Sequence, residues 1–76
     1  MQLPFFKYHG TGNDFVLVDN RNGLLRGDEF STFAAMCHRR FGIGADGVIL
    51  LNLRDGYDFE MDYFNSDGNQ IGRAHV

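Results

Sequence analysis

The stretch Phe41-Gly42-Ile43-Gly44-Ala45-Asp46-Gly47 decides the fold, because a helical pattern ends there and a strand pattern follows it. Upstream, apolar residues recur with the spacing of an amphipathic helix, at Phe30, Phe33, Ala34, Cys37 and Phe41. Downstream, Val48-Ile49-Leu50-Leu51 is a short apolar run that predicts a buried strand. Gly42 suits a left-handed residue just past the helix, with Arg39 and Arg40 in the last turn.

The glycines of this stretch, Gly42, Gly44 and Gly47, also spell G-x-G-x-x-G, the fingerprint of dinucleotide-binding proteins. In those proteins the glycines follow a strand and open a helix, whose N-terminus binds the pyrophosphate. Here the predicted order is helix, loop, strand, so no helix N-terminus would face the phosphates. The sequence therefore does not favour a nucleotide site.

The composition limits what the chain can be. Its 76 residues allow one small domain, which would bury only about 60–65% of its unfolded surface. Seven basic and ten acidic side chains give a net charge of −3, with no basic cluster, which argues against nucleic acid as a partner. One cysteine excludes an internal disulfide and fits a reducing, cytoplasmic compartment. No membrane span and no signal peptide are predicted.

Two strands that pair as a hairpin are predicted before the helix. Phe5–His9 is an extended stretch, and Gly10–Asp14 has the composition of a tight turn. Residues 15–19 alternate as a second strand, so we expect the two strands to pair across the turn. Asp28 and Ser31 are the candidate N-caps of the helix.

A fourth strand is predicted after a turn at Arg54-Asp55-Gly56. Its apolar residues, expected to face the core, are Tyr57, Phe59, Met61 and Tyr63. Its carboxylates, expected to form a solvated face, are those of Asp58, Glu60 and Asp62. From Gln70 to Val76 no pattern predicts an element. The predicted fold is α+β, with the order ββαββ and an antiparallel sheet packed on one helix.

Three loops rich in Gly, Asn and Asp lie at the ends of these elements, at residues 10–14, 42–47 and 65–69. Turn chemistry explains any one of them, but three in one small domain favour a shared binding site. Cys37 lies on the apolar stripe of the helix, and we interpret it as a core residue. The spacing of His, Cys, Asp and Glu predicts no zinc or calcium site.

Three blocks of sequence carry a family resemblance: His9-Gly-Thr-Gly-Asn-Asp-Phe15, Arg39-Arg-Phe-Gly-Ile-Gly-Ala-Asp-Gly-Val48 and Tyr63-Phe-Asn-Ser-Asp-Gly68. In this order and spacing they resemble the start of diaminopimelate epimerase. The resemblance runs from about Leu3 to Gly68 but covers only the opening part of that family's longer proteins. It implies that residues 1–76 are an N-terminal fragment of the first of two similar α/β domains that face each other across a cleft.

The resemblance also implies a function. Proteins of this family interconvert LL- and meso-diaminopimelate, a small-molecule amino acid, for lysine and peptidoglycan precursor biosynthesis, with neither pyridoxal phosphate nor metal. No cofactor is therefore expected. By resemblance, Asn13 and Asn65 correspond to loop asparagines that bind the polar groups of the substrate. The glycines beside them would let the backbone approach the substrate closely.

The resemblance implies a two-base mechanism, in which one cysteine removes the α-proton and a second, on the other face, returns one. In the family the first thiol belongs to a Cys-Gly-Asn-Gly motif shortly after Asn-Ser-Asp-Gly, and the second comes from the other domain. This chain departs from the family in a divergent tail, residues 69–76, where the thiol is expected near Ala74 and no such motif occurs. Cys37 matches a non-catalytic helix cysteine. The chain alone is therefore predicted to be inactive.

Two alternatives to this function stay open. One is a related racemase or isomerase of the same architecture, and the other is a truncated, non-catalytic binding or assembly module. Eight Phe and three Tyr, together with the missing partner domain, predict an exposed apolar patch and hence self-association.

Overall fold

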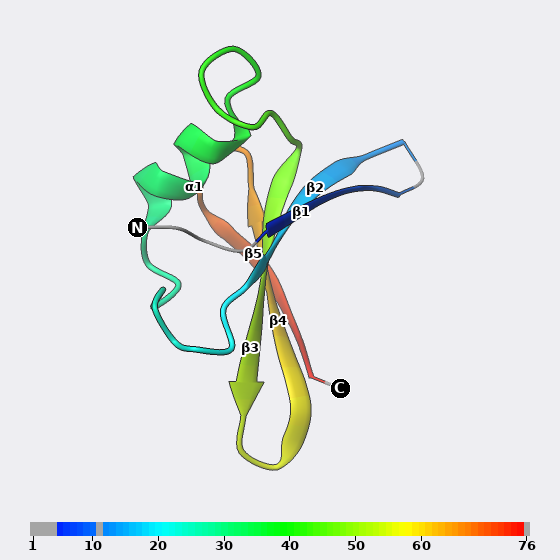
Figure 1. The fold of residues 1–76 in the computed structure, drawn as a ribbon, viewed down its shortest axis with the longest axis vertical. Coiled ribbons are helices and arrows are strands. Elements are labelled where there is room, and N and C mark those ends of the chain that lie inside the picture. Colours follow the sequence, from blue (N-terminus) through cyan, green and yellow to red (C-terminus); the bar gives the residue numbers. More distant parts are fainter. Residues whose placement is uncertain (1–4, 11, 76) are drawn as a thin grey trace.

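The computed structural model describes residues 5–10 and 12–75, which form one sheet with a single helix on it (Figure 1). The predictions for residues 1–4, 11 and 76 lie outside this part of the chain. The elements in order are β1 (Phe5–His9), β2 (Asp14–Asp19), α1 (Phe30–Cys37), β3 (Gly47–Arg54), β4 (Tyr57–Asn65) and β5 (Gln70–His75). The predicted α+β class is confirmed.

The sheet is mixed, with the strand order β1-β2-β3-β4-β5. The predicted hairpin is confirmed, since β1 and β2 are antiparallel with Tyr8 opposite Phe15. β2 and β3, however, are parallel, with Phe15 opposite Gly47. The expectation of a wholly antiparallel sheet is wrong for this pair, because α1 and its flanking loops carry the chain back to the edge where β2 began.

The fifth strand, β5, was not predicted. It pairs with β4 in antiparallel register, with Ala74 opposite Met61 and Gly72 opposite Tyr63. The residues of this edge strand are exposed or half-buried, so its sequence carries no apolar alternation. The hairpin turn after β4, rather than the strand's own composition, brings it into the sheet.

The helix is shorter than its apolar spacing predicts. α1 ends at Cys37, and His38 leaves the helix with an extended backbone, at φ −63° and ψ 122°. Phe41 is 82% exposed and does not continue the apolar stripe. Arg39 and Arg40 therefore follow the helix instead of forming its last turn.

The glycines after the helix also differ from expectation. Gly42 is not left-handed; Gly44 is, with φ +83°. Gly42 is required for another reason, because a Cβ there would collide with the backbone carbonyls of Ala35 and Met36. The amides of residues 43 and 44 bond the Met36 carbonyl at 2.9 and 3.0 Å, which closes the end of the helix.

The start of the helix lies at neither predicted cap. Glu29 occupies the N-cap position, while Asp28 precedes it and Ser31 lies inside α1. The Glu29 carboxylate accepts hydrogen bonds from the amides of the preceding turn, at Arg26, Gly27 and Asp28. These bonds lower the pKa of Glu29 against the opposing effect of its partial burial.

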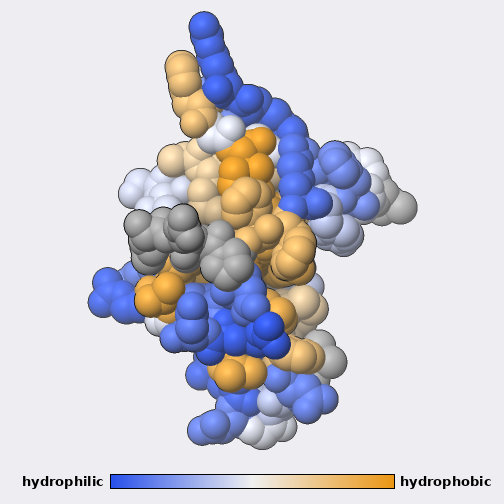
Figure 2. All heavy atoms as spheres, in the orientation of Figure 1, coloured by the Kyte–Doolittle hydropathy of each residue, from blue (hydrophilic) through white to orange (hydrophobic). Residues whose placement is uncertain are grey.

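The core lies between α1 and one face of the sheet. The rings of Phe33 and Phe64 pack with their centroids 4.4 Å apart, and both side chains are fully buried. Figure 2 shows apolar residues gathered over α1 and the adjacent sheet, with a polar region below them. The buried apolar cluster is made of Val16, Val18, Leu25, Phe33, Cys37, Ala45, Val48, Leu50 and Phe64.

Strand β4 has the opposite orientation to the predicted one. Phe64, opposite Val48, faces the core, so the alternation of the strand places Glu60 and Asp62 on the same side. The residues predicted to face the core are instead half-buried or exposed on the open face. The prediction that Glu60 and Asp62 form a solvated face is therefore wrong, since their side chains are only 2% and 7% exposed.

The two buried carboxylates are bonded by basic side chains at the lower end of the sheet (Figure 1). Arg54 forms a bidentate pair with Glu60 at 2.7 and 2.9 Å, and His75 Nε2 lies 2.9 Å from the same carboxylate. Arg73 Nε donates to Asp62 at 2.7 Å. The hydrogen bonds from Arg54, which outweigh desolvation, lower the pKa of Glu60 to about 2.

The loop after β4 is seated against the start of α1. Gly68 is buried and left-handed, with φ +89°, and a Cβ there would collide with the Phe30 carbonyl. Its amide donates to the Asn65 carbonyl at 2.9 Å, which closes the turn. Only a glycine fits this contact between the loop and the helix.

We predict that Glu60→Gln lowers the free energy of unfolding at pH 7 by about 1–3 kcal/mol, because charged hydrogen bonds to two partners are lost. The folded pKa, about 2, lies below the ordinary value of 4.5, so the carboxylate stabilises the fold fully above pH 4.5. That contribution is lost as the pH falls through about 2. Urea unfolding between pH 7 and pH 2 should show the gap between variant and parent closing; a gap that is constant with pH would contradict the assignment. Asp58→Asn, on the exposed part of the strand, is the control.

We predict that Gly68→Ala destabilises the chain more than Gly56→Ala does. Both glycines are left-handed, so each substitution costs about 1–2 kcal/mol in backbone strain. Gly56 has open space around it, whereas Gly68 faces the Phe30 backbone, which adds about 1–3 kcal/mol of overpacking. Chemical denaturation of both variants measures the difference, and equal losses would refute the contact.

Candidate functional site

The three loops that the sequence singled out lie at one edge of the sheet. β2 and β3 begin at Asp14 and Gly47, and β4 ends at Asn65, which is opposite Gly47. Since β2 and β3 are parallel and β4 is antiparallel to β3, these three ends meet at the upper edge in Figure 1. We call the loops at 10–14, 42–47 and 65–69 the loop edge.

Asn13 and Asn65 are both exposed at the loop edge. Asn65 lies two strands from Phe15 in one row of the sheet, a separation of roughly 10 Å at the usual strand spacing. The Asn13 carbonyl accepts a hydrogen bond from the Gly10 amide at 2.7 Å, which ties Asn13 to the end of β1. The structure brings the two predicted site residues to one edge; their role in binding stays a prediction.

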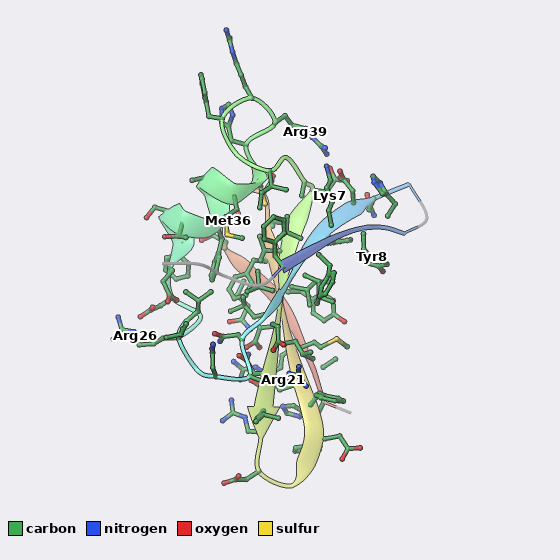
Figure 3. The ribbon with its side chains drawn as sticks, viewed as in Figure 1. Lys7, Tyr8, Arg21, Arg26, Met36 and Arg39 are labelled. Atoms are coloured by element: carbon green, nitrogen blue, oxygen red, sulfur yellow. The ribbon has the colours of Figure 1, made fainter. Side chains whose placement is uncertain are left out.

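An ion-paired group joins two of the loops. Arg39 donates to both oxygens of Asp14 at 2.8 Å and to Asp46 at 3.1 Å. Lys7 Nζ lies 3.2 Å from the Asp14 carboxylate. Figure 3 shows the Arg39 and Lys7 side chains approaching each other from the loop after α1 and from β1. The Arg39 guanidinium, above all, holds the pKa of Asp14 well below its usual range.

Sequence reasoning missed this group. The pattern placed Arg39 in the last helical turn, and it gave no reason to connect that residue with Asp14, 25 positions away. The available signal was that Asp14, Arg39 and Asp46 belong to the blocks that carry the family resemblance. Their contact required the parallel pairing of β2 and β3, which was not predicted.

Cys37 is a core residue, as predicted. It is 3% exposed at the end of α1, and its carbonyl accepts a hydrogen bond from the Ala45 amide at 3.1 Å. Burial raises the pKa of the Cys37 thiol, which disfavours the thiolate that a base or nucleophile requires. Cys37 therefore does not have the properties of a catalytic thiol.

The described residues outline no metal centre and no membrane helix. Among residues 5–10 and 12–75, no group of three or more His, Cys, Asp and Glu side chains is arranged to hold a metal ion. The only helix in that part of the chain, α1, has eight residues and is too short to cross a bilayer.

A second polar region lies at the opposite end of the sheet. A pocket of about 230 Å³ opens there, beside Asn20, Asn52 and the buried carboxylates of Glu60 and Asp62. Its polar groups bond one another: Asn20 Nδ2 donates to Asn52 Oδ1 at 2.6 Å, and Asn52 Nδ2 donates to Asp62 at 2.9 Å. These internal bonds indicate a structural network rather than a binding site.

Comparison with known proteins gives one consistent result. The chain matches the family described as Diaminopimelate epimerase over residues 5–72. It is 50% identical over 68 residues to the diaminopimelate epimerase of Flavobacterium psychrophilum, covering 90% of this chain and 27% of that protein. It is 53% identical over 70 residues to that of Synechococcus sp. (strain JA-3-3Ab), covering 91% and 25%. The enzyme of Archaeoglobus fulgidus is 44% identical over 72 residues, covering 92% and 26%.

The chain spans about a quarter of the length of the curated relatives it matches. The match of residues 5–72 includes all three loops of the loop edge and both predicted site asparagines. The 76-residue chain belongs to the diaminopimelate epimerase family.

Proposed function

We propose that this chain supplies part of the substrate site of an amino-acid epimerase that interconverts LL- and meso-diaminopimelate. One observation carries the proposal: Asn13 and Asn65 are exposed at one edge of the sheet, in a chain whose relatives are named diaminopimelate epimerase. The same proposal includes a cytoplasmic role in lysine and peptidoglycan precursor biosynthesis, with no cofactor. In it, residues 1–76 form the N-terminal part of the first domain, with 69–76 as the divergent segment.

The chemistry of the loop edge suits an amino acid. An asparagine amide both donates and accepts hydrogen bonds, so it can bind a carboxylate through its NH₂ group and an ammonium through its oxygen. Two such side chains on different strands can hold the groups around an α-carbon in a fixed orientation, which lowers the entropic cost of reaction. The backbone of the neighbouring glycines can approach the substrate closely.

Inversion at the α-carbon by two bases needs a proton acceptor on one face and a donor on the other. The 76 residues include one thiol, that of Cys37, and it is buried with a raised pKa. Ala74 lies within β5, four residues and about 13 Å along the strand from Gln70 at the loop edge. These positions support the proposal that the chain by itself is inactive and contributes binding rather than proton transfer.

The alternatives are a related racemase or isomerase of the same architecture, and a non-catalytic binding or assembly module. The first would act on an amino acid other than diaminopimelate at the same loop edge. The second would leave the loop edge without a small-molecule ligand. Ligand titration separates these possibilities.

We predict that LL-diaminopimelate, added to the ¹⁵N-labelled chain, shifts the NMR signals of the loop edge. Asn13→Ala and Asn65→Ala should each weaken binding about tenfold, which is the effect of losing one hydrogen bond to a charged group. Asn22→Ala is the matched control, because Asn22 is exposed outside the loop edge. Equal binding by all three variants would refute the binding role assigned to Asn13 and Asn65. Binding of another amino acid in place of diaminopimelate would favour the racemase alternative.

We also predict that neither the chain nor Ala74→Cys exchanges the α-proton of diaminopimelate with heavy water above the rate without protein. Ala74→Cys restores at most one of the two bases, and position 74 lies away from the loop edge. Proton NMR of the substrate measures the exchange. Exchange by the unmodified chain would require a base among its own residues.

We propose further that the chain alone self-associates through the open face of the sheet. Phe6, Leu17, Ile49 and Tyr63 form one row across β1, β2, β3 and β4 on the face opposite α1. Phe6 is 66% exposed and extends this apolar row to the edge strand β1. A second copy of the chain can bury the Phe6 side chain there.

Sedimentation of the chain over a wide concentration range should therefore reveal dimers or larger species. Phe6→Lys should weaken this association, whereas Phe41→Lys, at an exposed position outside the sheet, should not. A monomer at all concentrations would exclude this surface as an interface.

A further inference from the structure

The ion-paired group at the loop edge has a geometry that binds two loops to each other. Asp14 directly follows Asn13, and Asp46 lies in the loop before β3. Arg39 contacts both carboxylates, with two bonds of 2.8 Å to Asp14 and one of 3.1 Å to Asp46. One side chain thus spans the loops that precede the two parallel strands.

Asp14 and Asp46 also bond each other directly, through their amides. The Asp14 amide donates to the Asp46 carboxylate at 3.1 Å. The Asp46 amide donates to the Asp14 carbonyl at 2.9 Å and to the Asp14 carboxylate at 3.1 Å. This places two carboxylates beside each other, and Asp14 is only 7% exposed, so their repulsion must be offset.

Arg39 is suited to offset that repulsion, and a lysine would not replace it. A guanidinium is planar and always charged, and its fork of donors can bond two oxygens of one carboxylate and still reach a second. Lys7 also lies 3.2 Å from Asp14, but it comes from β1 and, within the described residues, it forms no ion pair with Asp46. Arg39 is therefore the cation that joins the two loops.

We infer that Arg39 is a positioning residue, which fixes Asn13 relative to the starts of β2 and β3 by joining Asp14 to Asp46. Asn13 has an exposed side chain, so its orientation depends on the anchored residue that follows it. The importance of this position for ligand binding rests on the proposed function. The fixing of the loop itself does not, and it can be measured without ligand.

The test compares Arg39→Lys with Arg40→Lys in the 76-residue chain. Arg39→Lys keeps the charge and removes the fork, whereas Arg40 is a neighbouring arginine whose guanidinium lies over the Phe41 ring at 5.5 Å. In Arg39→Lys, amide hydrogen exchange at Asp14 and Asp46 should accelerate about tenfold or more, as expected for the loss of a charged hydrogen bond. The amides of Val48 and Phe64 in the core should be unchanged, and Arg40→Lys should match the parent at all four.

A second variant covers the case in which Arg39→Lys does not fold. Asp46→Asn changes an exposed side chain, keeps the Arg39 pair with Asp14 and weakens the bond from the Asp14 amide. Asp46→Asn should accelerate amide exchange at Asp14 by a smaller factor than Arg39→Lys does, and it should leave the amides of Val48 and Phe64 unchanged. Parent-like exchange at Asp14 in either folded variant would overturn the inference.

Titration with LL-diaminopimelate separates this inference from the proposed function. If the parent binds the ligand and Arg39→Lys binds it about tenfold more weakly, with exchange at the core amides unchanged, the proposed function and the inference about Arg39 are both supported. If the parent binds and Arg39→Lys binds equally well, Arg39 does not position Asn13 for the ligand and the inference fails. If the parent does not bind, the proposed function fails, and the exchange rates alone decide whether Arg39 fixes the loop.

Discussion

The parallel pairing of β2 with β3 is the constraint on which the rest of the structure depends. It sets Phe15 opposite Gly47, and the antiparallel β4 then sets Asn65 opposite the same glycine. Three loops that are far apart in sequence are brought to one edge as a result. The same pairing gives Asp14 and Asp46 a common position at the start of neighbouring strands, where one arginine can bond both.

This constraint also explains which features the sequence could predict. Local patterns found the β1–β2 hairpin, the body of α1 and strand β3, because each depends on residues close in the chain. It extended the helix to Phe41 because an apolar residue happened to continue the spacing, although the chain leaves the helix at His38. It missed β5, whose place depends on pairing with β4 rather than on its own composition.

The candidate site divides in the same way. The glycine- and asparagine-rich composition of the loops was visible in the sequence, and the family resemblance supplied Asn13 and Asn65. The network around Arg39 was not visible, since it depends on the pairing of Arg39 with Asp14, 25 positions away, which follows from the topology of the sheet. The buried carboxylate of Glu60 was missed for a related reason: an alternating strand fixes two faces but does not say which one is covered.

The buried carboxylates of β4 have a consequence for how the sheet chooses its alignment. Tyr63 and Phe64 are adjacent and both aromatic, so hydrophobicity alone would let the strand flip either one toward α1. A shift of one residue would carry Glu60 and Asp62 to the other face, away from Arg54 and Arg73. That alignment would break the ion pairs of Glu60 with Arg54 and of Asp62 with Arg73, so these pairs favour the observed register over the shifted one.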